Sequence, residues 1–139
     1  MVEVIAPKPK ETICDPACGT GGFLLASHDY IAKHFKLNKD QKRFLDESAL
    51  RGWELVHNTA RLCAMNMMLH GIGHGDDLPL MVSDSLASDP GNRFEIVMTN
   101  PPFGKKSSTI AKWLFDNNQQ LLLEDVQVVE DIQVQVLLQ

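Results

Sequence analysis

The sequence predicts a three-layer α/β domain built around a parallel β-sheet. Short apolar segments with strand character alternate with longer segments whose apolar residues recur every three to four positions, as they do in helices. This alternation favours strands that pair in parallel through right-handed helical crossovers. A length of 139 residues with 44% hydrophobic residues suits one folded domain, and no stretch approaches the roughly eighteen consecutive apolar residues of a membrane span.

Four strands are expected, over residues 11–15, 49–54, 80–84 and 94–99. A helix over about 22–36 and a second over 56–70 connect the first three strands, and Gly71 ends the second helix. Residues 37–48 are rich in Lys, Asp and Gln, which indicates a polar insertion with one short helix. Turn-forming residues at 89–92 separate the last two strands.

A polar residue falls at or just after the end of each expected strand, namely Asp15, Glu54, Asp84 and Asn100. In an open parallel sheet, the carboxyl ends of the strands form one edge, and ligands bind there where the strand order reverses. The four side chains are therefore expected to line one binding edge.

The charge and the cysteines limit the class of protein. The formal net charge of −5 is unfavourable for a protein that grips a phosphate backbone by bulk charge alone, so any action on nucleic acid requires local basic patches or a partner. Cys14, Cys18 and Cys63 form no CxxC pair, which favours reduced thiols over a disulfide framework or a zinc site. With no secretory signal pattern at residues 1–10, we expect a cytoplasmic protein.

Residues 15–23, Asp-Pro-Ala-Cys-Gly-Thr-Gly-Gly-Phe, join the first strand to the first long helix. Glycines let the backbone approach a ligand, and the helix start presents free N–H groups, so the turn suits a nucleoside ligand. The segment lacks the spacing of a phosphate-binding P-loop or of a dinucleotide fingerprint. An ordinary tight turn is the alternative interpretation.

A second motif, Asn100-Pro101-Pro102-Phe103, directly follows an apolar strand. Two prolines fix the backbone and remove two donors, so carbonyl oxygens project rigidly beside the Asn side chain. Such acceptors suit an exocyclic amino group, and an aromatic ring suits stacking on its base. A proline-rich loop with a core Phe is the alternative.

Taken together, three blocks at residues 15–24, 60–72 and 100–104 resemble the modification subunit of type I restriction-modification systems, an adenine-N6 DNA methyltransferase. The resemblance covers about residues 1–108. It implies an incomplete Rossmann-like fold of S-adenosylmethionine-dependent methyltransferases. It also implies a chain truncated at both ends relative to that family, with residues 1–108 as a partial methyltransferase domain and 109–139 as a divergent tail.

The resemblance also implies a role for individual residues. Those implied in binding S-adenosylmethionine are Asp15, Gly19, Thr20 and Gly21 around the methionine moiety, Glu54 at the ribose, Asp84 and Leu86 at the adenine, and Ala17 within the same turn. Those implied in catalysis are Asn100, Pro101, Pro102 and Phe103, which would receive the amino group of a flipped adenine and stack on its ring. Neither a metal nor a covalent enzyme intermediate is implied.

The implied partners are double-stranded DNA and the specificity and restriction subunits of a type I system, with no membrane. A glutamine-N5 protein methyltransferase is an alternative within the same chemistry, although Phe103 in place of Tyr favours DNA. A different class of alternative is a catalytically inactive remnant that binds only cofactor or partner subunits. For the tail over 121–138, the apolar positions fit both an amphipathic helix and a strand that covers the sheet edge.

Overall fold

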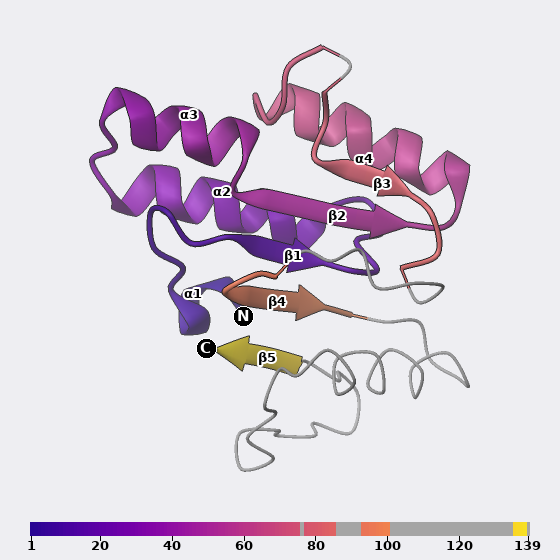
Figure 1. The fold of residues 1–139 in the computed structure, drawn as a ribbon, viewed down its shortest axis with the longest axis horizontal. Coiled ribbons are helices and arrows are strands. Elements are labelled where there is room, and N and C mark those ends of the chain that lie inside the picture. Colours follow the sequence, from indigo (N-terminus) through magenta and orange to yellow (C-terminus); the bar gives the residue numbers. More distant parts are fainter. Residues whose placement is uncertain (76, 86–92, 101–134, 139) are drawn as a thin grey trace.

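The structure is a computed structural model that describes residues 1–75, 77–85, 93–100 and 135–138. It is an α/β domain with a twisted sheet and packed helices, as the sequence predicts (Figure 1). In chain order its elements are α1 (Val2–Ile5), β1 (Ile13–Asp15), α2 (Gly22–His34), α3 (Lys39–Glu47), β2 (Leu50–Glu54), α4 (His57–Leu69), β3 (Leu80–Val82), β4 (Ile96–Thr99) and β5 (Gln135–Leu138).

The strands form one sheet in the order β3-β2-β1-β4-β5. β1, β2, β3 and β4 pair in parallel, and their arrows point the same way in Figure 1. The chain runs outward from β1 to β2 and β3, then returns to place β4 on the other side of β1. The strand order therefore reverses between β1 and β4, and the carboxyl ends of these two strands define the switch point of the sheet.

The elements lie where the sequence predicts them, with shorter strands than expected. The strand expected over 80–84 ends at Val82, and the one expected over 94–99 begins at Ile96. β5 departs from the purely parallel sheet because it pairs antiparallel to β4. For residues 121–138 the sequence left helix and strand open; the described part, 135–138, is a strand, and residues 101–134 lie outside the described residues. α1 was not predicted, since four residues are too few for a periodic pattern.

The core lies between one face of the sheet and the helices. Strand residues Ile13, Leu50 and Met98 are buried against apolar residues of α2 and α4. α2 packs on β1 and β2, and α4 packs on β2 and β3. In the described part of the chain, no helix has both the length and the apolar composition needed to cross a membrane.

Local capping defines the helix ends. Asn38 and Gln41 form a reciprocal capping box at the start of α3, which explains why the polar insertion contains a helix. α4 stops before Gly71, whose φ of 73° is strained for any residue with a side chain. These signals are readable in the sequence, and the helix boundaries follow them closely.

A buried histidine ties α2 to α3. Nε2 of His28 donates a hydrogen bond to Oδ1 of Asp46 at 3.0 Å, and Nζ of Lys42 bonds the other carboxylate oxygen at 2.8 Å. Partial burial raises the pKa of the Asp46 carboxyl, but the hydrogen bonds from Lys42 and His28 outweigh this effect and hold that pKa below its usual value. The ionised carboxylate therefore stabilises the fold.

Replacing this carboxylate should destabilise the protein. We expect Asp46→Asn to lower the free energy of unfolding by roughly 1–3 kcal/mol at neutral pH, because buried His28 loses a charged partner. Since the folded-state pKa of Asp46 is lowered, its contribution is present above the unfolded-state value of about 4 and is lost as the pH falls through the folded-state value. Urea unfolding of both proteins across this pH range measures the effect.

Asp40→Asn is the matched control for this prediction. Asp40 lies on the same helix, is almost fully exposed, and meets Arg43 only at 3.7 Å. It should leave the unfolding free energy nearly unchanged. Equal destabilisation by the two substitutions would contradict the role given to the His28–Asp46 bond.

Candidate cofactor and catalytic site

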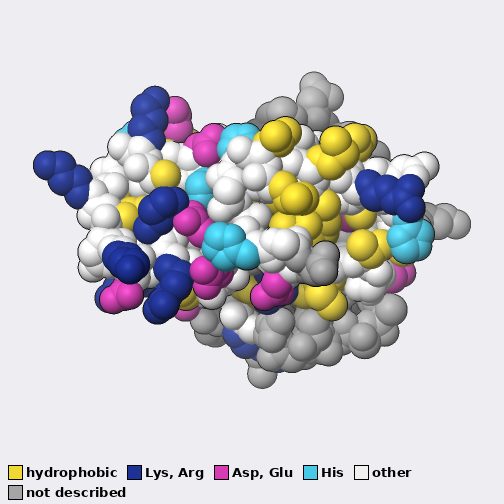
Figure 2. Space-filling view, turned by 90° about the horizontal axis from the view of Figure 1, so that it is seen from above, with side chains coloured by type: hydrophobic (Ala, Val, Ile, Leu, Met, Phe, Trp, Pro, Cys, Tyr) yellow, Lys and Arg dark blue, Asp and Glu magenta, His cyan; other side chains and the backbone are white. Residues whose placement is uncertain are grey.

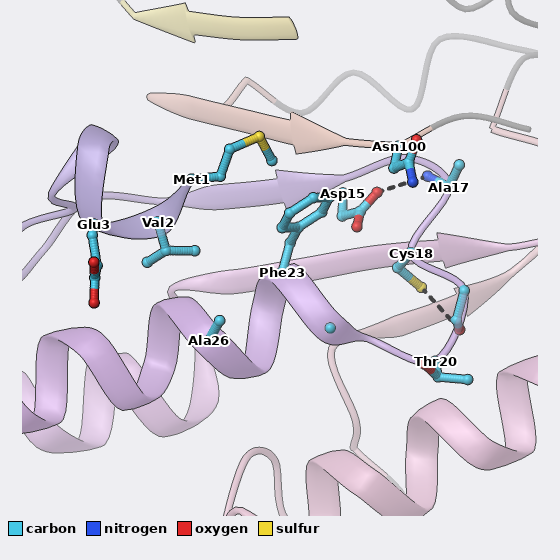
Figure 3. A pocket seen from close by; sticks show the side chains of 12 residues that line it. Met1, Val2, Glu3, Asp15, Ala17, Cys18, Thr20, Phe23, Ala26 and Asn100 are labelled. Carbon is cyan, nitrogen blue, oxygen red and sulfur yellow. Dashed lines mark hydrogen bonds between the residues drawn. The ribbon is translucent and has the colours of Figure 1, made fainter. Parts of the chain in front are cut away.

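The main pocket lies at the switch point of the sheet and encloses about 570 Å³ (Figure 3). This volume is within the range of small-molecule sites. The residues that line it are Met1, Val2, Glu3, Asp15, Ala17, Cys18, Gly19, Thr20, Gly22, Phe23, Ala26 and Asn100. Asp15 ends β1 and Asn100 directly follows β4, so two neighbouring parallel strands bring these polar residues to one opening.

The glycine-rich turn between β1 and α2 is held by hydrogen bonds from four parts of the chain. The N–H of Ala17 donates a hydrogen bond to Oδ1 of Asp15, at the end of β1, at 3.1 Å. The N–H of Cys18 donates to the carbonyl of Trp53 on β2 at 2.9 Å. Nδ2 of Asn66 on α4 donates to the carbonyl of Thr20 at 3.0 Å. The hydroxyl of Ser85, which follows β3, donates to the carbonyl of Pro16 at 2.8 Å. The turn is therefore fixed before any ligand binds.

Gly21 is required by both its conformation and its surroundings. Its φ is 88°, and a Cβ atom at this position would lie 2.9 Å from Sγ of Cys63 on α4. The missing side chain thus allows α4 to pack directly under the start of α2. Gly22, the next residue, has open space around the position of a Cβ.

Asp15 is the most unusual charged group of the site, because only 2% of it is exposed. Burial raises the pKa of its carboxyl to about 7, although the hydrogen bond from the Ala17 N–H lowers it, and the nearby charge of Glu54 raises it further. Near neutral pH this carboxyl therefore exchanges between its neutral and ionised forms. A cation in the pocket would favour the ionised form.

Glu54 and Asp84 lie on the same edge of the sheet. Glu54 ends β2, and its Oε1 accepts a hydrogen bond from the N–H of Val56 at 2.7 Å. This hydrogen bond fixes one oxygen of the carboxylate. Asp84 is exposed two residues beyond the end of β3. Neither residue lines the main pocket, which lies at the β1–β4 part of this edge.

The predicted site residues divide into three groups. Those that line the pocket are Asp15, Ala17, Gly19, Thr20 and Asn100. Those on the same edge but outside the lining are Gly21, Glu54 and Asp84. Those outside the described residues are Leu86, Pro101, Pro102 and Phe103.

Sequence reasoning missed two kinds of residue. α1 packs on α2, and this contact brings Met1, Val2 and Glu3 to the pocket, a placement that no local pattern indicates. Asn66 anchors the turn from a distance of 46 residues along the chain. The local sequence shows only that Asn66 is a polar residue among mostly apolar positions of α4, and this does not identify Thr20 as its partner.

The strand order, the glycine turn after β1 and the polar residue after β4 are those of a Rossmann-like fold with a ligand site at its switch point. Comparison with known proteins identifies the class as that of the methyltransferases. Residues 1–127 match the family model described as N-6 DNA Methylase. The chain therefore belongs to the N-6 DNA methylase family.

Two relatives and one more distant structure illustrate the relationship. The type I restriction enzyme StySPI methylase subunit of Salmonella potsdam is 37% identical over 119 residues, which are 78% of this chain and 22% of the relative. The second relative is the type I restriction enzyme EcoKI methylase subunit of Escherichia coli K12. The crystal structure of the EcoKI M protein superposes on this chain with a TM-score of 0.70 at 38% identity, covering 75% of this chain and 23% of that protein. A complex of SMU.472 with SAH shares the fold at 13% identity and a TM-score of 0.51, over 83% of this chain and 39% of that one. The chain spans about a fifth of the length of the type I subunits.

The packing around Gly21 gives a direct test of the turn geometry. We expect Gly21→Ala to destabilise the fold by roughly 1–3 kcal/mol, because the new methyl group meets Cys63 and the left-handed backbone disfavours a side chain. Gly22→Ala, one residue along the same helix start, should be neutral within about 0.5 kcal/mol. Thermal unfolding of both variants measures the difference, and equal stability of the two would refute the described packing.

Proposed function

We propose that this chain contains the cofactor pocket and the start of the catalytic loop of an adenine-N6 DNA methyltransferase of the type I modification-subunit kind. The reaction would transfer a methyl group from S-adenosylmethionine to the amino group of an adenine flipped out of double-stranded DNA. The single observation that carries the proposal is that Asp15, residues of the glycine turn and Asn100 line one pocket at the switch point, with Asn100 beside Asp15 and Ala17 (Figure 3). Family membership and the type I relatives support it.

The pocket residues fit S-adenosylmethionine. This cofactor combines a sulfonium cation with an amino group, a carboxylate and an adenosine, so it needs both an anionic partner and backbone donors. Asp15 offers a buried carboxylate whose ionised form is incompletely stabilised, and the start of α2 offers free N–H groups. When bound, the cofactor supplies an electrophilic methyl group.

We assign the cofactor-binding roles by position along the sheet edge. Asp15, Ala17, Gly19, Thr20 and Gly21 hold the methionine part at the turn. Glu54, at the end of β2, accepts hydrogen bonds from the ribose hydroxyls through its remaining carboxylate oxygen. Asp84, beyond β3, accepts from the amino group of the cofactor's adenine, and Leu86 flanks that ring.

Asn100 and the residues after it act on the target base. The exocyclic amino group of adenine is a weak nucleophile, because its lone pair is delocalised into the ring. The side-chain oxygen of Asn100 and the carbonyl of Pro101 accept the two amino hydrogens, which orients the nitrogen towards the pocket and localises its lone pair. Pro102 keeps the loop rigid and Phe103 stacks on the base. Positioning and electrostatics therefore supply most of the catalysis.

Sequence recognition and assembly belong to partners in this proposal. With a net charge of −5, the chain lacks the general positive charge that binds DNA non-specifically. The relatives are named as subunits of type I restriction enzymes. We therefore propose that specificity and restriction subunits supply most of the DNA contacts, in the cytoplasm, where the DNA substrate lies.

The buried carboxyl predicts a pH-dependent affinity. Because the ligand is a cation and the pKa of Asp15 is about 7, binding below that pH must release the proton from the carboxyl. We expect calorimetric titration with S-adenosylmethionine to show roughly tenfold weaker binding at about pH 5.5 than at about pH 7. Adenosine, which lacks the cation, should show little change.

Asp15→Asn tests the same point from the protein side. The variant should bind S-adenosylmethionine weakly at both pH values. It should also stabilise the ligand-free chain above neutral pH, because a raised folded-state pKa means that Asp15 costs stability as the pH rises from about 4 to about 7. Tight, pH-independent binding by the unmodified chain would remove Asp15 from the cofactor site.

Asn100 separates catalysis from cofactor binding. We expect Asn100→Ala to retain cofactor affinity within a few fold and to lose at least about a hundredfold in methyl transfer to adenine in DNA, measured with tritiated cofactor and added specificity subunit. Transfer by the unmodified chain would exclude the inactive remnant. Cofactor binding without transfer, under conditions in which a complete type I subunit is active, would favour that remnant and contradict the proposal.

A further inference from the structure

α4 has apolar residues on both its inner and its outer face. On the inner face, Ala60, Cys63 and Met67 are buried in the core. On the outer face, four large apolar side chains are exposed, and we call them the α4 stripe: Leu62, Met65, Met68 and Leu69. Leu69 alone is 82% exposed. A helix that is apolar on all sides is normally buried on all sides.

Three residues of the stripe share one side of α4. Residues 62, 65 and 69 follow the spacing at which helices pack on one another. Figure 2 shows hydrophobic side chains gathered in the middle of this face, with basic side chains beside a His at one end of the group and a mixture of acidic, His and basic side chains at the other. A groove of about 320 Å³ runs beside the stripe between α4 and β3, and its walls include Ala64, Leu80 and Val82.

We propose that a second copy of this chain covers the α4 stripe, with the two α4 helices packed antiparallel around a two-fold axis near Met65 and Asn66. Such an axis places Leu62 of one copy against Leu69 of the other, and the reverse, so the same patch is complementary to itself. Met65 then meets its own counterpart at the axis. The grooves on both sides accept the flanking side chains.

The charges at the two ends of α4 suit this arrangement. Arg61 is exposed near the start of the helix and forms no ion pair with another described residue. The same axis places it beside the carboxyl end of the partner's helix, where the helix dipole is negative. Oδ1 of Asp29 lies there, 3.1 Å from Nδ1 of His70, and its side chain is 58% exposed. Each Arg61 thus gains an anionic environment that its own copy does not provide.

The available area is sufficient for a weak, specific dimer. The four exposed side chains of the α4 stripe and the groove wall offer on the order of 300 Å² of apolar surface on each copy. Because apolar atoms make up somewhat more than half of a typical interface, the pair would bury on the order of 1,000 Å² in total, at the lower limit for specific interfaces. We therefore expect a dimer with a dissociation constant in the micromolar range.

Sedimentation equilibrium of the full 139-residue chain from about 2 to about 200 µM tests the proposal. We expect a monomer–dimer equilibrium for the unmodified chain and a dissociation constant raised at least about tenfold by Leu69→Glu. Val4→Glu is the matched control, since Val4 is 88% exposed, apolar and remote from the stripe; it should leave the constant unchanged. A chain that remains monomeric at the highest concentration, or equal effects of the two variants, would overturn the proposal.

A cross-linking experiment tests the axis itself. Met65→Cys should form a disulfide-linked dimer under copper–phenanthroline oxidation, whereas Val4→Cys should not, because the axis brings position 65 of one copy to position 65 of the other. The three native cysteines are buried and serve as a common background. Equal cross-linking of the two variants would contradict the geometry. Because no residue of the stripe lines the main pocket, Leu69→Glu should bind S-adenosylmethionine normally, which keeps this test independent of the proposed function.

Discussion

The central position of β1 in the sheet determines the rest of the site. Only a strand with parallel partners on both sides, β2 and β4, places its final residue at the point where the strand order reverses. Asp15 occupies that point and is buried as a result, while Asn100 reaches the same pocket from β4. The glycine turn that follows must then leave the sheet at once and start α2, which requires left-handed backbone at Gly19 and Gly21.

In the proposed function, this arrangement favours a bound cationic ligand and destabilises the empty site. A carboxyl that is almost fully buried beside Glu54 is costly in its ionised form, and a pKa near 7 expresses that cost. Hydrogen bonds from α4, β2 and the segment after β3 keep the turn in place despite the unfavourable burial of the Asp15 carboxylate and its repulsion by Glu54. The site is therefore rigid in its backbone and unsatisfied in its charge, a combination that favours a cationic ligand over water.

The sequence predicted features that depend on local order and missed those that depend on tertiary contact. Periodicity and turn residues located α2, α3, α4 and the four parallel strands, because each uses signals within ten or fifteen residues. The shared edge of Asp15, Glu54 and Asp84 followed from the carboxyl ends of those strands. In contrast, α1 is held at the pocket by its packing on α2, and the Asn66–Thr20 bond joins residues 46 positions apart. No local pattern contains such information.

α4 shows how one helix can serve three surfaces at once. Cys63 packs against Gly21 on its inner side, Asn66 holds the turn from its flank, and Leu62 and Leu69 remain on its outer side. The contacts of Cys63 and Asn66 with the glycine turn fix the rotation of α4 about its own axis. The outer residues therefore cannot turn inward. An apolar outer face therefore cannot be relieved within one copy of the described fold, and it costs free energy until another surface covers it. The same contacts that hold the glycine turn thus present α4 as a rigid, preformed surface, which lowers the entropic cost of association.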